Sequence, residues 1–265
     1  MNFRERVRQI LTAANAFMEG VFYPQGASCQ VCGELRKVDF HYALCEECMN
    51  AMDDLRVPAA ACDKCLFPVR RGSACSMCTS RRMKSIDKSY APFCYHKQVR
   101  KLIHEFKFEH NASFLAYLGD QMANALTDRQ YDMIVPVPLH RKRLEDRGRN
   151  QALILAEALS LRTGIPVSEV LERTQYKKPQ SATPMAQRVK NVEGSFRCLK
   201  DLTDKRILLV DDVRTTGSTA QACALMMKRA GAGYVGLCTV AVVYRDPKKM
   251  RRSKKKMKKF IRKRI

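Results

Sequence analysis

Long apolar stretches are missing from this 265-residue chain. No segment approaches the run of about 20 apolar residues that a membrane-spanning helix needs, so we expect no transmembrane segment. The beginning, MNFRERVRQILTAANAFMEGV, has no uninterrupted apolar core of signal-peptide length and no cleavage-like site. These absences predict a cytoplasmic protein, in which thiols stay reduced.

Aromatic residues make up only 8% of the chain, and the final segment, Lys248 to Ile265, has no acidic residue. Phe260 is essentially the only aromatic side chain in the basic segments. An extended platform on which bases stack is therefore not expected there, and any nucleic-acid contact would run mostly through phosphates.

Positive charge is present in large excess, with a formal net charge of +23 and a pI near 9.8. Twelve positive charges lie in Lys248 to Ile265, and removing them leaves +11 (23 − 12). A surplus of this size favours a polyanionic partner, because neutralising phosphates releases condensed counterions. A solvated tail that only aids solubility is the alternative, and a basic tail alone does not distinguish DNA, RNA or an anionic membrane.

Twelve cysteines stand out, and eight of them form four C-x2-C pairs. The pairs are Cys29 with Cys32, Cys45 with Cys48, Cys62 with Cys65, and Cys75 with Cys78. A two-residue gap lets both sulfurs reach one tetrahedral ion, and two pairs complete a closed structural Zn²⁺ site. Pairing neighbours gives two zinc ribbons in series, whereas a cross-braced pairing joins the first pair to the third and the second to the fourth. Spacing leaves both arrangements open.

Metal binding changes the charge only slightly. Four thiolates on each Zn²⁺ leave a net charge of −2 per site, so two sites lower +23 to about +19. The isolated Cys94, Cys198, Cys223 and Cys238 are expected to be small buried hydrophobic residues.

The chain is long enough for one α/β domain and a smaller module. We predict an amphipathic helix over residues 1–24, a double zinc ribbon over 25–84, an α/β domain over 85–245 and a basic tail over 246–265. In the α/β domain, apolar strands are predicted at 88–95, 132–139, 206–213 and 235–244, and helices at 98–108, 114–126, 150–164 and 219–232. Apolar strands separated by helices indicate a parallel sheet covered on both faces. The polar segment between Leu171 and Phe196 is expected to be a mobile excursion near the site.

The segment ILLVDDVRTTGST, Ile207 to Thr219, carries the clearest chemical signal. Its apolar start predicts a strand, so Asp211 and Asp212 would emerge at the carboxyl end, where open α/β sheets bind ligands. The short residues Thr215, Thr216, Gly217, Ser218 and Thr219 then lead into a helix, and their N–H groups and hydroxyls converge on an anion. Carboxylates that accept from vicinal hydroxyls beside a phosphate loop describe a site for a ribose 5-phosphate. A capped helix after a buried strand is the alternative.

This segment resembles the 13-residue PRPP-binding signature of type I phosphoribosyltransferases. Together with VPVPLHRKRLEDRGRNQA (Val135 to Ala152), KKPQSATPMAQRVKNVEGSF (Lys177 to Phe196) and the four cysteine pairs, it resembles the ComF family of competence proteins. The likeness runs from about residue 20 to residue 243. It implies a phosphoribosyltransferase-type fold behind a double zinc ribbon, and a protein that supports uptake of single-stranded DNA in natural transformation beside a ComFA-like helicase ATPase.

A transferase that uses PRPP must hold Mg²⁺-pyrophosphate as well as the 5-phosphate. Asp211 and Asp212 are the candidate catalytic residues. The candidates for pyrophosphate, each of which is alternatively a surface or DNA-phosphate contact, are Arg141, Arg143, Arg147 and Arg188, with Arg149 nearby. His140 is expected to be a structural hydrogen-bonding residue rather than a base.

Three hypotheses follow. The first is a DNA-binding accessory factor for transformation whose phosphoribosyl site senses or uses PRPP. The second is an active phosphoribosyltransferase with an unknown acceptor, and the third is a PRPP-responsive regulator or adaptor whose zinc ribbons bind a protein. We favour the first, with the second as the alternative.

Overall fold

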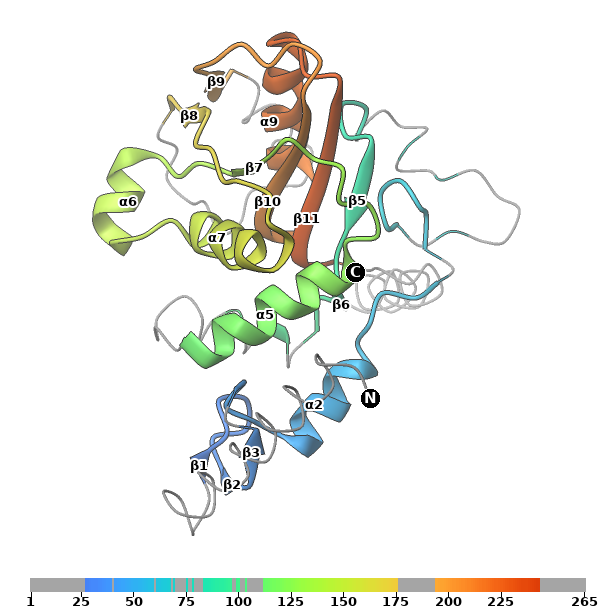
Figure 1. Ribbon diagram of the computed structural model, residues 1–265, viewed down its shortest axis with the longest axis vertical. Coiled ribbons are helices and arrows are strands. Elements are labelled where there is room, and N and C mark those ends of the chain that lie inside the picture. The colour runs from blue at the N-terminus through green and yellow to red at the C-terminus, as the bar shows by residue number, and fades with distance from the viewer. Residues whose placement is uncertain are drawn as a thin grey trace, which may run out of the picture.

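The computed structural model describes residues 27–39, 41–59, 61–67, 69, 75, 78, 83–96, 99–100, 103, 112–175 and 194–243 (Figure 1). The predicted helix over 1–24, the segment that holds Arg188 and the basic tail from 246 lie outside these residues.

A five-stranded parallel sheet forms the centre of the larger domain (Figure 1). Its strands pair in the order β5-β11-β10-β7, and β6 also pairs with β11. The strands are β5 (Lys88–Tyr90), β6 (Phe93–Cys94), β7 (Met133–Pro136), β10 (Arg206–Arg214) and β11 (Tyr234–Val242). The long apolar runs of β10 and β11 are buried on both faces, as expected for central parallel strands.

The strand predicted at 88–95 is split in two. β5 and β6 both lie along the same edge of β11, separated by Ala91 and Pro92. Proline has no N–H to donate to the ladder, which explains the interruption.

Helices cover both faces of the sheet, which confirms the predicted fold class. Leu208 and Val210 of β10 belong to a core that includes residues of α5 (Ala112–Ala125) and α7 (Gln151–Thr163). Ile207 and Leu209 belong to a second core, against α9 (Ser218–Arg229). Alternate side chains of one strand therefore enter opposite layers.

The ends of α7 follow its sequence closely. The side chain of Asn150 accepts a hydrogen bond from the N–H of Ala152, which caps the first turn. At the other end Gly164 adopts φ 75°, a left-handed conformation that favours glycine, and confirms the predicted helix end.

The polar segment after Leu171 is better ordered at its base than the sequence predicts. β8 (Leu171–Arg173) and β9 (Phe196–Cys198) pair antiparallel, with Leu171 opposite Cys198. Three-residue strands carry too little periodicity to be recognised in a sequence. The segment is thus tied down on both sides of residues 176–193, which lie outside the described range.

The cysteine-rich module begins with two short antiparallel hairpins and a helix. These elements are β1 (Ala27–Ser28), β2 (Leu35–Arg36), β3 (Val38–Asp39), β4 (Leu44–Cys45) and α2 (Glu46–Asp53). The β3–β4 hairpin lies between the first and second cysteine pairs, with Val38 opposite Cys45.

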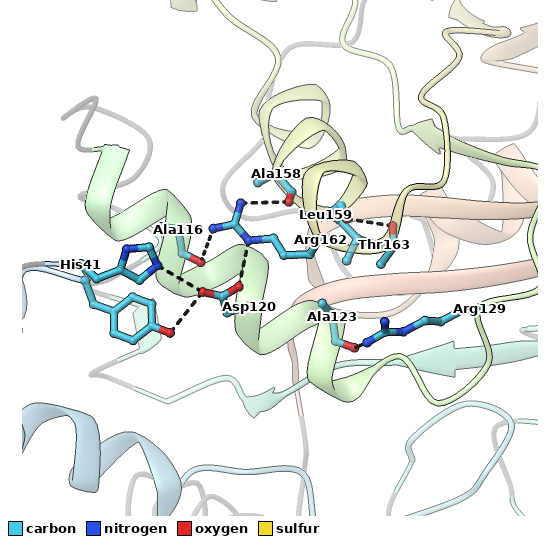
Figure 2. A network of polar contacts seen from close by, with 10 residues as sticks. His41, Ala116, Asp120, Ala123, Arg129, Ala158, Leu159, Arg162 and Thr163 are labelled. Atoms are coloured by element: carbon cyan, nitrogen blue, oxygen red, sulfur yellow. Dashed lines mark hydrogen bonds and ion pairs between the residues drawn. The ribbon is translucent and has the colours of Figure 1, made fainter. Parts of the chain in front are cut away.

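The module is anchored to the α/β domain by a polar network around Asp120 of α5 (Figure 2). Asp120 accepts hydrogen bonds from Arg162 Nε of α7 at 2.9 Å and from the hydroxyl of Tyr42 at 3.1 Å. His41 Nε2 lies 3.7 Å from the same carboxylate. One carboxylate therefore joins the first hairpins to two helices of the larger domain.

The prediction for the isolated cysteines is half right. Cys223 and Cys238 are fully buried in the core. Cys94 and Cys198 are only half-buried, because each lies in a short strand at an edge, where its sulfur contacts a backbone carbonyl, Arg56 O and Lys200 O respectively.

Within the described residues, no helix is long and apolar enough to cross a bilayer.

Candidate phosphate site and metal centres

The eight paired cysteines gather into two clusters of four. One cluster contains Cys29, Cys32, Cys45 and Cys48, and the other contains Cys62, Cys65, Cys75 and Cys78. The clusters thus form from neighbouring pairs, which decides against the cross-braced alternative.

The sulfur positions fit a tetrahedral Zn²⁺ ion. Four sulfurs at about 2.3 Å from one ion lie about 3.8 Å from each other. The sulfurs of each cluster all lie within 4.8 Å of one another, and Cys62 Sγ and Cys78 Sγ are 3.8 Å apart. Four thiolates would fill the coordination sphere of such an ion and leave no position open for catalysis, as in structural zinc sites.

Backbone N–H groups prepare the first cluster for a metal. Burial alone would raise the pKa of Cys29, but N–H groups of Cys32, Cys45 and Val31 lower it to about 7. The N–H of Cys45 lies 3.3 Å from Cys29 Sγ. This environment favours the thiolate, the form that binds zinc.

The candidate phosphate site begins where β7 ends. Pro136, the last residue of β7, lies opposite Val210, while β10 continues to Arg214 and remains paired with β11. Asp211 and Asp212 therefore lie in the last part of β10, toward the carboxyl end at which the sequence analysis expects them. They are half-buried on the part of β10 that β7 no longer covers.

The two carboxylates also shape the backbone. Asp211 Oδ1 accepts from the N–H of Asp212 at 2.9 Å, and Asp212 Oδ1 accepts from the N–H of Val213 at 2.6 Å. These local bonds fix both side chains beside the chain reversal that follows.

The turn from β10 into α9 forms a small hollow. Residues 215–219 line it, together with Asp211, Arg214 and Thr239. Gly217 precedes α9 with φ 79°, and the hydroxyls of Thr216 and Ser218 are 3.0 Å apart. The first turn of α9 has no acidic residue and no side-chain cap bond, so its positive dipole end is directed at the hollow. Of the predicted PRPP-binding residues, Asp211 and residues 215–219 therefore line this hollow, whereas Asp212 does not.

The sequence HRKRLED folds as a short helix, α6 (Arg141–Arg147). His140 caps it by accepting from the N–H of Lys142 through Nδ1, which confirms the structural role expected for this histidine. Gly148 ends the helix with φ 72°.

The arginines predicted to hold pyrophosphate occupy different environments. Arg141 is exposed and pairs with Glu145 one turn along α6. Arg143 is half-buried and lies close enough to Arg173 of β8 to affect its pKa. The side chain of Arg147 and all of Arg188 lie outside the described part of the chain.

Comparison with known proteins agrees with this architecture. The phosphoribosyl transferase domain family matches residues 149–265. The DNA utilization protein YhgH of Escherichia coli is 29% identical over 209 residues, which cover 74% of this chain and 88% of that protein. Competence protein ComFC of Bacillus subtilis is 23% identical, over 71% of this chain and 79% of that protein. Competence protein F of Haemophilus influenzae is 27% identical, over 69% of this chain and 79% of that protein.

The chain is similar to competence proteins of the ComF family and carries a phosphoribosyl transferase domain. The phosphoribosyltransferase fold and the N-terminal cysteine clusters predicted from that resemblance are both present.

Sequence reasoning missed three residues in or near the candidate phosphate site. Arg173 is buried enough that its pKa is lowered, with burial the largest cause and Arg143 the next, while Cys223 and Asp211 act in the opposite direction. Thr239 faces Asp211 across the β10–β11 register, and Arg214 is 3% exposed beneath the loop. Thr239 is placed only by the strand register, and nothing in the sequence signals that Arg173 is half-buried or that Arg214 is buried.

Proposed function

We propose that this protein is a member of the ComF family that binds PRPP at the β10–α9 turn and acts in handling single-stranded DNA during natural transformation. The observation that carries the proposal is the hollow at Gly217, in which Asp211, the first residue of the acidic pair, lies beside residues 215–219 and the N-terminus of α9. In this proposal residues 25–84 form the double zinc ribbon and residues 85–245 the phosphoribosyltransferase-like domain.

The hollow offers one group for each part of the ligand. Residues 215–219 would hold the 5-phosphate through N–H groups and hydroxyls. Asp211 and Asp212 would accept hydrogen bonds from the vicinal ribose hydroxyls. Mg²⁺ would bring charge compensation for the pyrophosphate, and Arg173, whose pKa is influenced by both Arg143 and Asp211, is a candidate cation for it.

The DNA role is supported by the relatives and by charge. The relatives carry the names DNA utilization protein and competence protein, and this chain has a net charge of +23. A surplus of this kind binds nucleic acid through phosphates irrespective of sequence. We further propose a cytoplasmic location and a ComFA-like helicase ATPase as partner.

The DNA role is tested by fluorescence anisotropy of the full-length protein with a labelled single-stranded oligonucleotide across a salt series. We expect a plot of the logarithm of the affinity against the logarithm of the salt concentration to be linear. Its slope should become more negative by about 0.7 for each phosphate contacted. The variant Asp211→Asn, Asp212→Asn is the control and should give the same slope, because the acidic pair serves the sugar phosphate. Affinity that does not change with salt, or no affinity, would contradict the DNA role.

A second candidate, an active phosphoribosyltransferase, is favoured by the same acidic pair. It predicts PRPP-dependent release of pyrophosphate that is lost in Asp212→Asn. Release that is unchanged in this variant would exclude this activity at the β10–α9 turn.

A further inference from the structure

Arg214 at the end of β10 is a buried cation for which the described residues offer no hydrogen bond. It is 3% exposed, and its three guanidinium nitrogens have no partner within the described part of the chain. A charged group in such a position is costly unless another charge compensates it.

The cysteines of the second cluster are the groups whose charge influences the pKa of Arg214. Burial lowers the pKa of Arg214, and the four cysteines of that cluster, Cys65, Cys75, Cys62 and Cys78, act in the opposite direction. When Zn²⁺ binds, the cysteines are deprotonated and the site carries a net charge of −2. A metal-loaded second cluster therefore provides the counter-charge that the guanidinium lacks.

The same region packs directly on the phosphate-binding turn. Arg214 lines the hollow, and a Cβ placed on Gly217 would lie 3.8 Å from Arg214 Cδ. Met83, which follows the second cluster, is fully buried against Gly217. Ser85 exchanges two hydrogen bonds with Gln221 of α9.

Within the described residues, the first cluster has no such connection. Cys29 and Cys45 belong to the hydrophobic core that contains α5 and α7, whereas Cys65 belongs to the core that contains α9. The two cysteine clusters thus attach to opposite faces of the sheet, and only one of them adjoins the turn.

We propose that Arg214 is a positioning residue that couples the second zinc site to the phosphate-binding turn. Its guanidinium balances the zinc–tetrathiolate charge, and its stem supports Gly217. Metal in the second cluster, and not in the first, then keeps residues 215–219 in their binding conformation. This inference does not depend on which ligand the turn accepts.

The first test is zinc release from the full-length, zinc-loaded protein into a chromogenic chelator. In Arg214→Gln we expect one of the two zinc ions to be released about 10- to 100-fold faster, the usual effect of removing an outer partner of a metal site. Arg214→Lys keeps the charge and should restore slow release. Wild-type rates in Arg214→Gln, or equal acceleration of both ions, would overturn the proposal.

The second test measures amide hydrogen exchange in a peptide that covers residues 215–219. Cys78→Ser and Cys48→Ser are matched variants, since each removes the last ligand of one cluster and both side chains are half-buried. We expect faster exchange in Cys78→Ser and unchanged exchange in Cys48→Ser. Equal exchange in the two variants would overturn the coupling even if Arg214→Gln fails to fold.

Discussion

Replacing Gly217 by alanine tests the packing beneath the phosphate-binding turn. Gly217 has φ +79°, and a Cβ there would lie 2.3 Å from Met83 Sδ, far closer than van der Waals contact. The left-handed conformation costs an alanine about 1–2 kcal/mol. Displacing a fully buried methionine adds about 1–3 kcal/mol. The total loss of unfolding free energy is therefore about 2–5 kcal/mol.

Gly164 provides a matched control. It has φ +75° but nothing within 4 Å of the Cβ position, so Gly164→Ala incurs only the conformational cost of about 1–2 kcal/mol. Denaturant unfolding in excess zinc measures both variants. A double-mutant cycle with Met83→Ala should recover about 1–3 kcal/mol of coupling between positions 83 and 217. Equal destabilisation by the two glycine variants, with no coupling to Met83, would refute the packing.

Three further predictions concern other parts of the molecule. Asp120→Ala should lower the unfolding free energy by about 2 kcal/mol, because it removes the carboxylate partner of Arg162, which is 21% exposed, and the acceptor of the Tyr42 hydroxyl. Arg141→Ala should change it by less than about 0.5 kcal/mol, since its pair with Glu145 is exposed. Denaturant titration would contradict this prediction if both variants behaved alike. Arg173→Gln should raise the dissociation constant for Mg²⁺-pyrophosphate at least about 10-fold, and equal affinities in calorimetry would remove Arg173 from the site. Burial raises the pKa of Tyr117 to about 12, so the unfolded chain loses the hydroxyl proton at a lower pH than the folded protein, and stability falls as pH rises above about 10. Tyr117→Phe should lessen this loss of stability at alkaline pH. An unchanged profile of stability against pH in this variant would refute the prediction.

The sequence anticipates the fold where the pattern is long and local. β10 and β11 are continuous apolar runs, and Asn150 and Gly164 mark the ends of α7 as capping rules predict. The cysteine spacing likewise identifies the ligands of both clusters, because a C-x2-C pair determines its own geometry.

What the sequence does not show depends on contacts between distant segments. The choice of neighbouring cysteine pairs over cross-braced ones is set by how the module folds, and spacing fits both. Arg214 is buried because Met83 and the second cluster pack against β10. These segments lie more than 100 positions before Arg214 in the chain. The position of Thr239 beside Asp211 requires the strand register.

The most direct test of the central claim is calorimetric titration of Mg²⁺-PRPP into the full-length, zinc-loaded protein and into Asp211→Asn, Asp212→Asn. Asparagine keeps an oxygen that accepts the local N–H bonds of Asp212 and Val213, so the variant removes charge while preserving the turn. Both proteins carry the same basic tail, so binding of PRPP to the tail is common to both. We predict saturable binding to one site per chain that is lost in the variant. Equal binding by both proteins, or no binding by either, would contradict a phosphoribosyl site at the β10–α9 turn.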